Sequence, residues 1–238
     1  MKAFLYSTFL QWKLDLRNQE VFITCYLVPL VFFAFMGGIF GSLTPDAKTT
    51  LIQSMTIFGV TMGAILGAPV PLVEIYGSDI KKAYKVGGIP LWVTAATNFI
   101  SVFIHLLIMS TVIFILAPIL FNATIPENLL LYFISLGIFI AVCINIGTIL
   151  GIFVKSTSKL TMLAQLIFLP SIVLSGIMLP TELLPNVFET VGKIFPATWA
   201  YELMTTSGFN LHLFTPLIIF LILTTLIIFI RLTMINKE

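Results

Sequence analysis

Six long apolar segments dominate the sequence, and short polar connections separate them. Each segment is close to the about 20 residues that a helix needs to cross the hydrocarbon core of a bilayer. The segments are continuously apolar and lack the alternation of polar and apolar residues that a membrane β-barrel requires. The pattern predicts an all-α membrane protein with six transmembrane helices. The expected spans are 21–43, 51–73, 91–116, 129–154, 160–179 and 213–230.

The first 20 residues follow a different pattern. Apolar residues recur there at helical spacing, while charged residues occupy the other faces of the helix. The apolar positions are Leu5, Phe9, Trp12 and Leu16, and the charged ones are Lys2, Lys13, Asp15 and Arg17. Residues 1–20 are therefore predicted to form an amphipathic helix in the membrane interface, ahead of a six-span domain over 21–238. The alternative is a frayed end with incidental aromatic residues.

The composition excludes several classes of protein. Hydrophobic residues make up 59% of the chain and charged residues 9%, whereas soluble domains contain about 25% charged residues. Six crossings would use about 120 residues, which leaves too few for a soluble catalytic domain. The net charge of +2 argues against nucleic acid as a partner, because phosphate binding requires a basic face.

Lys and Arg residues are distributed unevenly between the two sides of the predicted membrane. Of the 12 such residues, all but Lys48 and Lys193 fall on the side that carries both termini. Cytoplasmic loops are enriched in Lys and Arg. Both termini are therefore predicted to be cytoplasmic.

Three glycines of the second predicted span, Gly59, Gly63 and Gly67, recur at every fourth residue. This spacing leaves one face of the helix without side chains, so that a neighbouring helix can approach closely. We expect this face to form a tight contact, either within the chain or with another subunit.

The sequence carries none of the common catalytic motifs. It contains no GxxxxGK[ST] loop, no HExxH, no GxSxG and no pair of intramembrane carboxylates. An SxxK sequence at 156–159 lies in a short connection between spans, which cannot build an oxyanion hole. Cys25 and Cys143 fall within apolar segments and have no further cysteines with which to form a metal site. We expect a chain that is not an enzyme and that binds no metal or cofactor itself.

Polar residues within the predicted spans are candidates for a transport path, because burying them in hydrocarbon is costly. His105 lies in the middle of the third span, and Asn98, Asn145 and Gln165 accompany it in spans three to five. For His105 we favour a neutral side chain that hydrogen-bonds a neighbouring helix over a ligand-binding or proton-relay role.

The connection between spans two and three, at 74–90, contains a predicted short helix. Ser78 or Asp79 can cap its start, the helix ends before Gly87, and Pro90 can open the next span. Such a helix on a tight connection could act as a rigid lever for a soluble partner. Alternatively, its lysines only fix the orientation of the chain in the membrane.

The segment after span five contains a second predicted short helix. Leu184, Val187, Val191 and Ile194 follow helical spacing around Pro185 and Pro196, and they predict an amphipathic helix of about three turns. Proline at each end favours this helix, since proline opens or ends a helix rather than continuing it. Residues 176–212 are therefore predicted to form a broken element that stays at the membrane.

These features together resemble the permease subunits of type 2 ABC exporters, a family that includes drug, polyketide, bacteriocin and polysaccharide exporters. The residues that carry the resemblance are Ser175, Gly176, Pro180, Leu184, Pro185, Pro196, Thr198, Trp199 and Ala200. The resemblance implies re-entrant helices that close the outer end of a path. Their site residues would be Gly176, Pro180, Pro185, Pro196, Trp199 and Glu202. It also implies a coupling helix that contacts an ATPase through Glu74, Gly77, Ser78, Asp79, Lys81, Lys82 and Lys85.

By the same resemblance, two permeases, identical or paralogous, would pair and bind a separate ATP-binding subunit that holds ATP and magnesium. Spans two and five would face the second permease. The cargo would be amphipathic or hydrophobic, such as a drug, an antimicrobial peptide or a lipid-like compound, and the location would be a bacterial cytoplasmic membrane. Two alternatives stay open: an ATP-independent channel or ion-coupled carrier, and a non-transporting assembly or immunity factor.

Overall fold

The computed structural model describes residues 2–43, 47–87, 90–178, 185–206 and 208–237, which form helices and connections and contain no strand. Six helical segments of this described part are long and apolar enough to cross a membrane. They are Gln19–Ile39, Lys48–Tyr76, Leu91–Phe121, Leu129–Phe153, Thr157–Leu174 and Leu211–Ile235, numbered here as spans one to six. The predicted all-α fold with six spans is confirmed.

The first two spans are interrupted helices. Span one contains α2 (Gln19–Phe22), a π-helical turn (Ile23–Leu27) and α3 (Val28–Leu43). Span two contains α4 (Ala47–Met62), a second π-helical turn (Gly63–Gly67) and α5 (Val70–Tyr76). The remaining spans are α7 (Leu91–Phe121), α8 (Leu129–Phe153), α9 (Thr157–Leu174) and α12 (Leu211–Lys237). Four shorter helices are described outside the spans: α1 (Lys2–Arg17), α6 (Ile80–Val86), α10 (Asn186–Gly192) and α11 (Pro196–Thr205).

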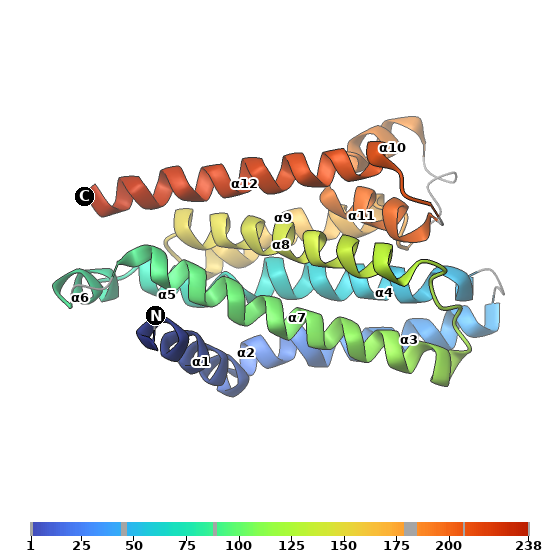
Figure 1. Cartoon of the computed structure of the whole chain (residues 1–238), viewed down its shortest axis with the longest axis horizontal. Helices are drawn as coiled ribbons and strands as arrows, with labels where there is room; N and C mark the ends of the chain where they lie inside the picture. Colours follow the sequence, from blue (N-terminus) through green and yellow to red (C-terminus); the bar gives the residue numbers. More distant parts are fainter. Residues whose placement is uncertain (1, 44–46, 88–89, 179–184, 207, 238) are drawn as a thin grey trace.

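Figure 1 shows an elongated bundle with α6 at one end and α10 and α11 at the other. We call these the α6 end and the α11 end. Both ends of the chain lie on the side that carries α6 (Figure 1). The termini therefore share one side, as the distribution of Lys and Arg predicts, and the cytoplasmic identity of that side stays a prediction.

Some boundaries differ from the predicted ones for local reasons. α7 continues through Pro118 to Phe121, and Asn122 ends it in a left-handed conformation with φ of 52°. α9 ends at Leu174 rather than at 179, and Gly176 then turns the chain with φ of 83°, a conformation that glycine adopts at little cost.

The helix predicted between Pro185 and Pro196 is shorter than expected. It ends at Gly192 after about two turns, so the prediction of three turns is wrong. The chain turns there because the Gly192 carbonyl accepts a 2.6 Å hydrogen bond from the Thr198 hydroxyl of the next helix. Pro196 then opens α11 as its first residue.

Span two forms the centre of the bundle. All ten residues from Leu51 to Val60 are buried, and 78% of the most apolar stretch of this span is covered, against 17–56% in the other spans. The expectation that span two faces a second permease is therefore wrong, because the helices of its own chain already cover it. Span five keeps more of its surface, with 28% of its stretch covered.

Candidate functional site

The short helix α6 follows directly from the sequence of the connection that carries it. The Ser78 hydroxyl donates to the Glu74 carbonyl and accepts from the Ile80 amide at 3.2 Å, so that it links the end of α5 to the start of α6. α6 ends at Val86, before Gly87, as predicted. Figure 1 shows α6 projecting beyond the spans at its end of the bundle.

Two contacts fix the base of α6 on the bundle. The Tyr76 hydroxyl donates a 2.7 Å hydrogen bond to the Leu91 carbonyl, which joins the end of span two to the start of span three. Gly77 lies against the connection between spans four and five: a Cβ at this position would lie 3.0 Å from the Lys155 carbonyl oxygen and 2.6 Å from that of Val73. A movement of α6 would therefore also displace the connection between spans four and five, which lies at the same end of the bundle.

The surface of α6 combines charged and apolar side chains. Lys82 and Asp79 form a 2.9 Å ion pair, and the hydrogen bond from Lys82 lowers the pKa of the Asp79 carboxyl. Both side chains are largely exposed, so this pair stabilises the helix only slightly. Val86, at the end of α6, is 90% exposed. Of the other predicted coupling residues, Glu74 is exposed, Lys81 is half-buried, and the side chain of Lys85 lies outside the described residues.

At the α11 end, α10 and α11 form a helical hairpin that is bonded across its turn. The Trp199 Nε1 donates to the Lys193 carbonyl at 2.8 Å, and the Thr198 hydroxyl donates to the Gly192 carbonyl in the same turn. Gly192 is buried and in close contact with the Leu174 carbonyl at the end of α9, so no larger residue fits there. The hairpin is therefore attached to span five.

α11 enters the core of the bundle. Ala197, Ala200 and Leu203 are fully buried on its inner face, where the helix packs on α8, α4 and α12. Pro196 is buried, Trp199 is half-buried, and Pro185 is exposed at the start of α10. Half-burial of Glu202 raises the pKa of its carboxyl. Of the other predicted gate residues, Gly176 is buried and Pro180 lies outside the described residues.

The glycine face of span two packs inside the chain. A Cβ at Gly59 would lie 2.6 Å from Met109 of α7, and one at Gly63 would lie 2.5 Å from Leu106 of the same helix. Gly67 contacts the Thr24 hydroxyl of span one. The sequence predicts a tight contact of the glycine face without identifying its partner. In the structure this contact is internal and joins span two to spans one and three.

The four polar residues predicted for a path lie apart and serve different contacts. The Asn98 amide donates to the Ala68 carbonyl at 3.2 Å. The Asn145 amide donates to the hydroxyls of Thr224 and Thr225 in α12. His105 Nδ1 and the Tyr26 hydroxyl are 2.7 Å apart, so the predicted hydrogen bond of His105 to a neighbouring helix is confirmed.

Gln165 differs from these three residues because it lies exposed on α9. It makes no contact with Asn98, His105 or Asn145 among the hydrogen bonds of the described residues. The structure therefore does not gather the four residues into one polar line within the chain, and their role in a path stays a prediction.

The family model for the ABC-2 type transporter matches residues 2–209, from α1 to beyond the end of α11. The chain belongs to the ABC-2 type transporter family. No curated protein sequence matches the chain significantly. The match includes both α6 and the hairpin of α10 and α11, the two elements on which the resemblance in sequence rests.

Membership in the ABC-2 family makes this chain the membrane subunit of a transporter, a multi-pass protein that works in general with an ATP-binding subunit. The match is consistent with a type 2 permease. The six spans contribute the membrane part of such a machine.

One cluster of functional interest in this ABC-2 permease was assigned wrongly from the sequence. Asp15 is predicted on the charged faces of the interfacial helix, but it is 2% exposed and bonds to α7. Its carboxylate accepts hydrogen bonds from Ser101 at 2.6 Å and from Gln11 at 2.8 Å. Trp12 stacks on His105 beside it, with ring centroids 6.0 Å apart. The sequence feature that could have predicted a paired Asp15 is Gln11, which lies one helical turn earlier on the same face of α1.

Proposed function

We propose that this chain is the permease subunit of an ATP-driven exporter. Two copies, or one copy and a paralogue, would pair and bind two ATP-binding subunits that hold ATP and magnesium. The observation that carries this proposal is α6, a capped helix that projects from the bundle within the region matched by the family. The side of α6 would then be the cytoplasmic side of a bacterial membrane.

α6 is suited to transmit movement because it is short, capped and supported at its base. Gly77 touches the connection between spans four and five at Lys155, so a push on α6 would reach spans two, three, four and five together. Closure of the ATP-binding subunits would favour one of two arrangements of these spans through such contacts. At the other end, α10 and α11 would form the gate.

The cargo would be amphipathic or hydrophobic. The described spans contain few charged side chains, and the amides of Asn98 and Asn145 donate to neighbouring helices. A strongly charged solute would therefore lose its hydration without compensation. This argument favours a drug, an antimicrobial peptide or a lipid-like compound over an ion or a sugar.

A cross-linking experiment tests the assignment of α6. Lys82→Cys places a thiol on an exposed position of α6, and Cys25 and Cys143 can stay because both are buried. A bifunctional reagent applied to native membranes should capture a protein with a phosphate-binding loop, and ATP should change the yield. The matched control is Thr206→Cys, exposed at the α11 end, which should capture no such protein.

Capture of no ATP-binding protein from α6, with the permease folded and abundant, would contradict the proposal. So would transport against a gradient by the purified chain alone. The first result would favour a non-transporting membrane factor, and the second an ion-coupled carrier.

A further inference from the structure

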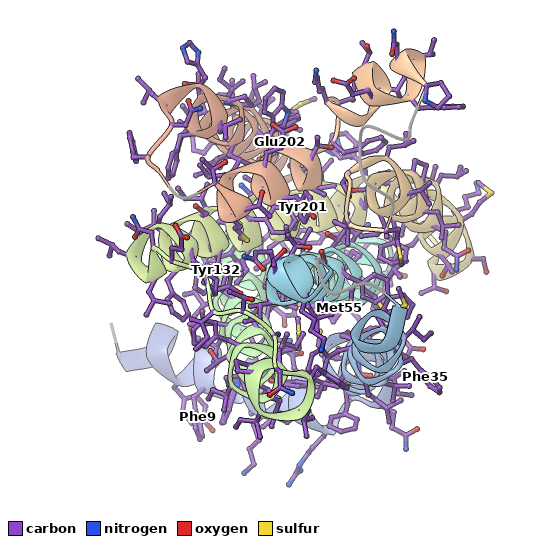
Figure 2. All side chains as sticks on the ribbon, turned by 90° about the vertical axis from the view of Figure 1, so that its right-hand side faces the viewer. Phe9, Phe35, Met55, Tyr132, Tyr201 and Glu202 are labelled. Carbon is purple, nitrogen blue, oxygen red and sulfur yellow. The ribbon has the colours of Figure 1, made fainter. Side chains whose placement is uncertain are left out.

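A small polar cavity lies at the α11 end of the bundle, within a single chain. Its volume is about 230 Å³, and it is enclosed by the first turns of α4, the connection from α7 to α8, the start of α8 and the end of α11. Figure 2 looks onto this end and labels Tyr132, which lines the cavity and whose hydroxyl is 3.0 Å from that of Thr56 in α4. None of the site residues predicted from the sequence lines this cavity.

Gln53 forms part of the wall and is only 4% exposed. Its Nε2 donates to the Met204 carbonyl at 3.5 Å, and because a carbonyl can only accept, this contact identifies the nitrogen of the amide. The Oε1 is buried and has no hydrogen-bond donor among the described residues. An acceptor buried in this way is unfavourable, so a molecule that donates a hydrogen bond to it, after a small adjustment of the side chain, would be stabilised.

The other polar groups of the cavity also favour a donor. The hydroxyls of Thr205 and Thr206 donate to the Tyr201 and Glu202 carbonyls at 2.9 Å and 2.7 Å, which leaves their lone pairs for an incoming donor. Glu127 lines the cavity as an exposed carboxylate and forms no ion pair among the described residues. No Lys, Arg or His belongs to the described lining. Glu127 is therefore the one charged residue of the described lining, and Lys48, whose carbonyl accepts from the Thr124 amide, lies outside it.

We propose that this cavity binds the ammonium group of an alkylamine. An ammonium group offers three N–H donors and no acceptor, and its charge complements Glu127. At about 30 Å³ for each small group, the volume per molecule of liquid water, the cavity accommodates an ammonium head with several carbons. The occupant is the amine of a cationic amphipathic cargo as it leaves the permease, since α11, which belongs to the proposed gate, forms one wall. This assignment of the cargo rests on the proposed exporter function.

Protection of a reporter cysteine tests the site without transport. Ile125→Cys places a thiol on an exposed residue of the lining, and the buried native cysteines do not compete for reagent. Labelling by a membrane-impermeant maleimide should slow about threefold when n-butylammonium is present at about twice its Kd. Neutral n-butanol should give no protection. The control reporter Val187→Cys, exposed on α10 and outside the cavity, should label at one rate throughout.

Two further substitutions decide whether the named groups bind the amine. Glu127→Gln and Gln53→Leu, each in the Ile125→Cys background, should remove the protection. Glu189→Gln, an acidic residue of α10 at the same end that does not line the cavity, should retain it. Equal protection by butanol, or protection that survives in both cavity variants, would overturn the proposal. Glu127 is exposed on a connection, so its variant is informative even if Gln53→Leu fails to fold.

The site and the exporter function can fail separately. Protection requires no ATPase, so its absence would remove the site and leave the exporter proposal standing. Protection without ATP-dependent movement of an amine-bearing amphipath in the complete complex would leave an ammonium site at the α11 end and contradict the assignment of the cargo.

Discussion

Ser101 donates a 2.6 Å hydrogen bond to Asp15 and thereby joins the first helix of the chain to the third span. The two residues are fully or almost fully buried, and Gln11 donates to the other carboxylate oxygen. α1 is therefore held against α7 by a polar contact in addition to apolar packing. A buried carboxylate without a cation is costly, so this contact should depend on pH.

The first prediction concerns that pH dependence. Burial raises the pKa of Asp15 above its ordinary value of 3.8, and the hydrogen bonds from Ser101 and Gln11 and the nearby His105 oppose this only in part. Docked α1 thus holds a proton that undocked α1 releases, so docking is strongest at low pH and weakens as the pH rises through the raised pKa. Hydrogen exchange of the α1 amides, corrected for intrinsic rates, should show protection that is strongest at or below the ordinary pKa of 3.8 and that falls as the pH rises through the raised pKa.

Two variants separate this effect from other titrations. Asp15→Asn keeps the shape and one acceptor of the side chain, and it should make the protection of α1 independent of pH. Ser101→Ala should weaken docking more above the raised pKa of Asp15 than below it, because the ionised carboxylate depends more on its donors. A pH dependence that persists in Asp15→Asn would show that another group is responsible.

The second prediction distinguishes a packing role of His105 from a role in an ion path. His105→Phe leaves the Tyr26 hydroxyl without its partner and should lower the free energy of unfolding by about 1–3 kcal/mol, while ATP-driven transport persists in whatever protein is folded. The double variant with Tyr26→Phe should recover part of this loss, since neither partner is then left unpaired. Complete loss of transport in a folded His105→Phe protein would instead favour an ion-coupled carrier.

The third prediction uses two glycines of α8. Gly147 is in close contact with the Ala64 carbonyl in the π-helical turn of span two, whereas a Cβ at Gly137 would meet nothing within 4 Å. Gly147→Ala should therefore destabilise the protein by at least about 1–3 kcal/mol through overpacking. Gly137→Ala should change the thermal midpoint little. Equal midpoints for the two variants in the same detergent would contradict the packing of α8 on span two.

Much of this architecture could be predicted from the pattern of apolar residues. The six spans follow from it because bilayer thickness fixes helix length, and α6 follows from the polar and glycine residues at 78–88 that bound it. The interior partners could not be predicted in the same way. Gln165 and Asn145 look alike in the sequence, yet only Asn145 is buried, because rotation of a helix about its axis depends on its neighbours.

The error over span two has a related cause. Its glycine spacing predicts close packing but does not identify the partner, and the partners are Met109, Leu106 and Thr24 of the same chain. The cavity at the α11 end could not be predicted either, because Gln53, Glu127 and Thr205 come together from three separate segments and share no local motif. Contacts between distant segments are the part of a site that periodicity does not encode.

The last prediction tests whether α6 transmits movement to the bundle. Gly77 has an ordinary helical conformation with φ of −84°, so space and not backbone freedom restricts this position. Gly77→Val would push the base of α6 away from the Lys155 carbonyl. Coupling energies along such contacts change by about 0.5–2 kcal/mol on substitution, so ATP-dependent transport should fall roughly 2- to 30-fold while the amount of protein in the membrane is unchanged.

The matched control for this experiment is Gly38→Val in span one, where a Cβ meets nothing within 4 Å. It should transport at the normal rate. Co-purification with the ATP-binding subunit distinguishes two causes of a loss at Gly77: a retained complex with slow transport indicates broken transmission, and a lost complex indicates broken docking. Full transport activity of Gly77→Val would show that the contact between the two connections does not transmit movement. If the chain is a membrane factor that does not transport, its own function should tolerate the substitution.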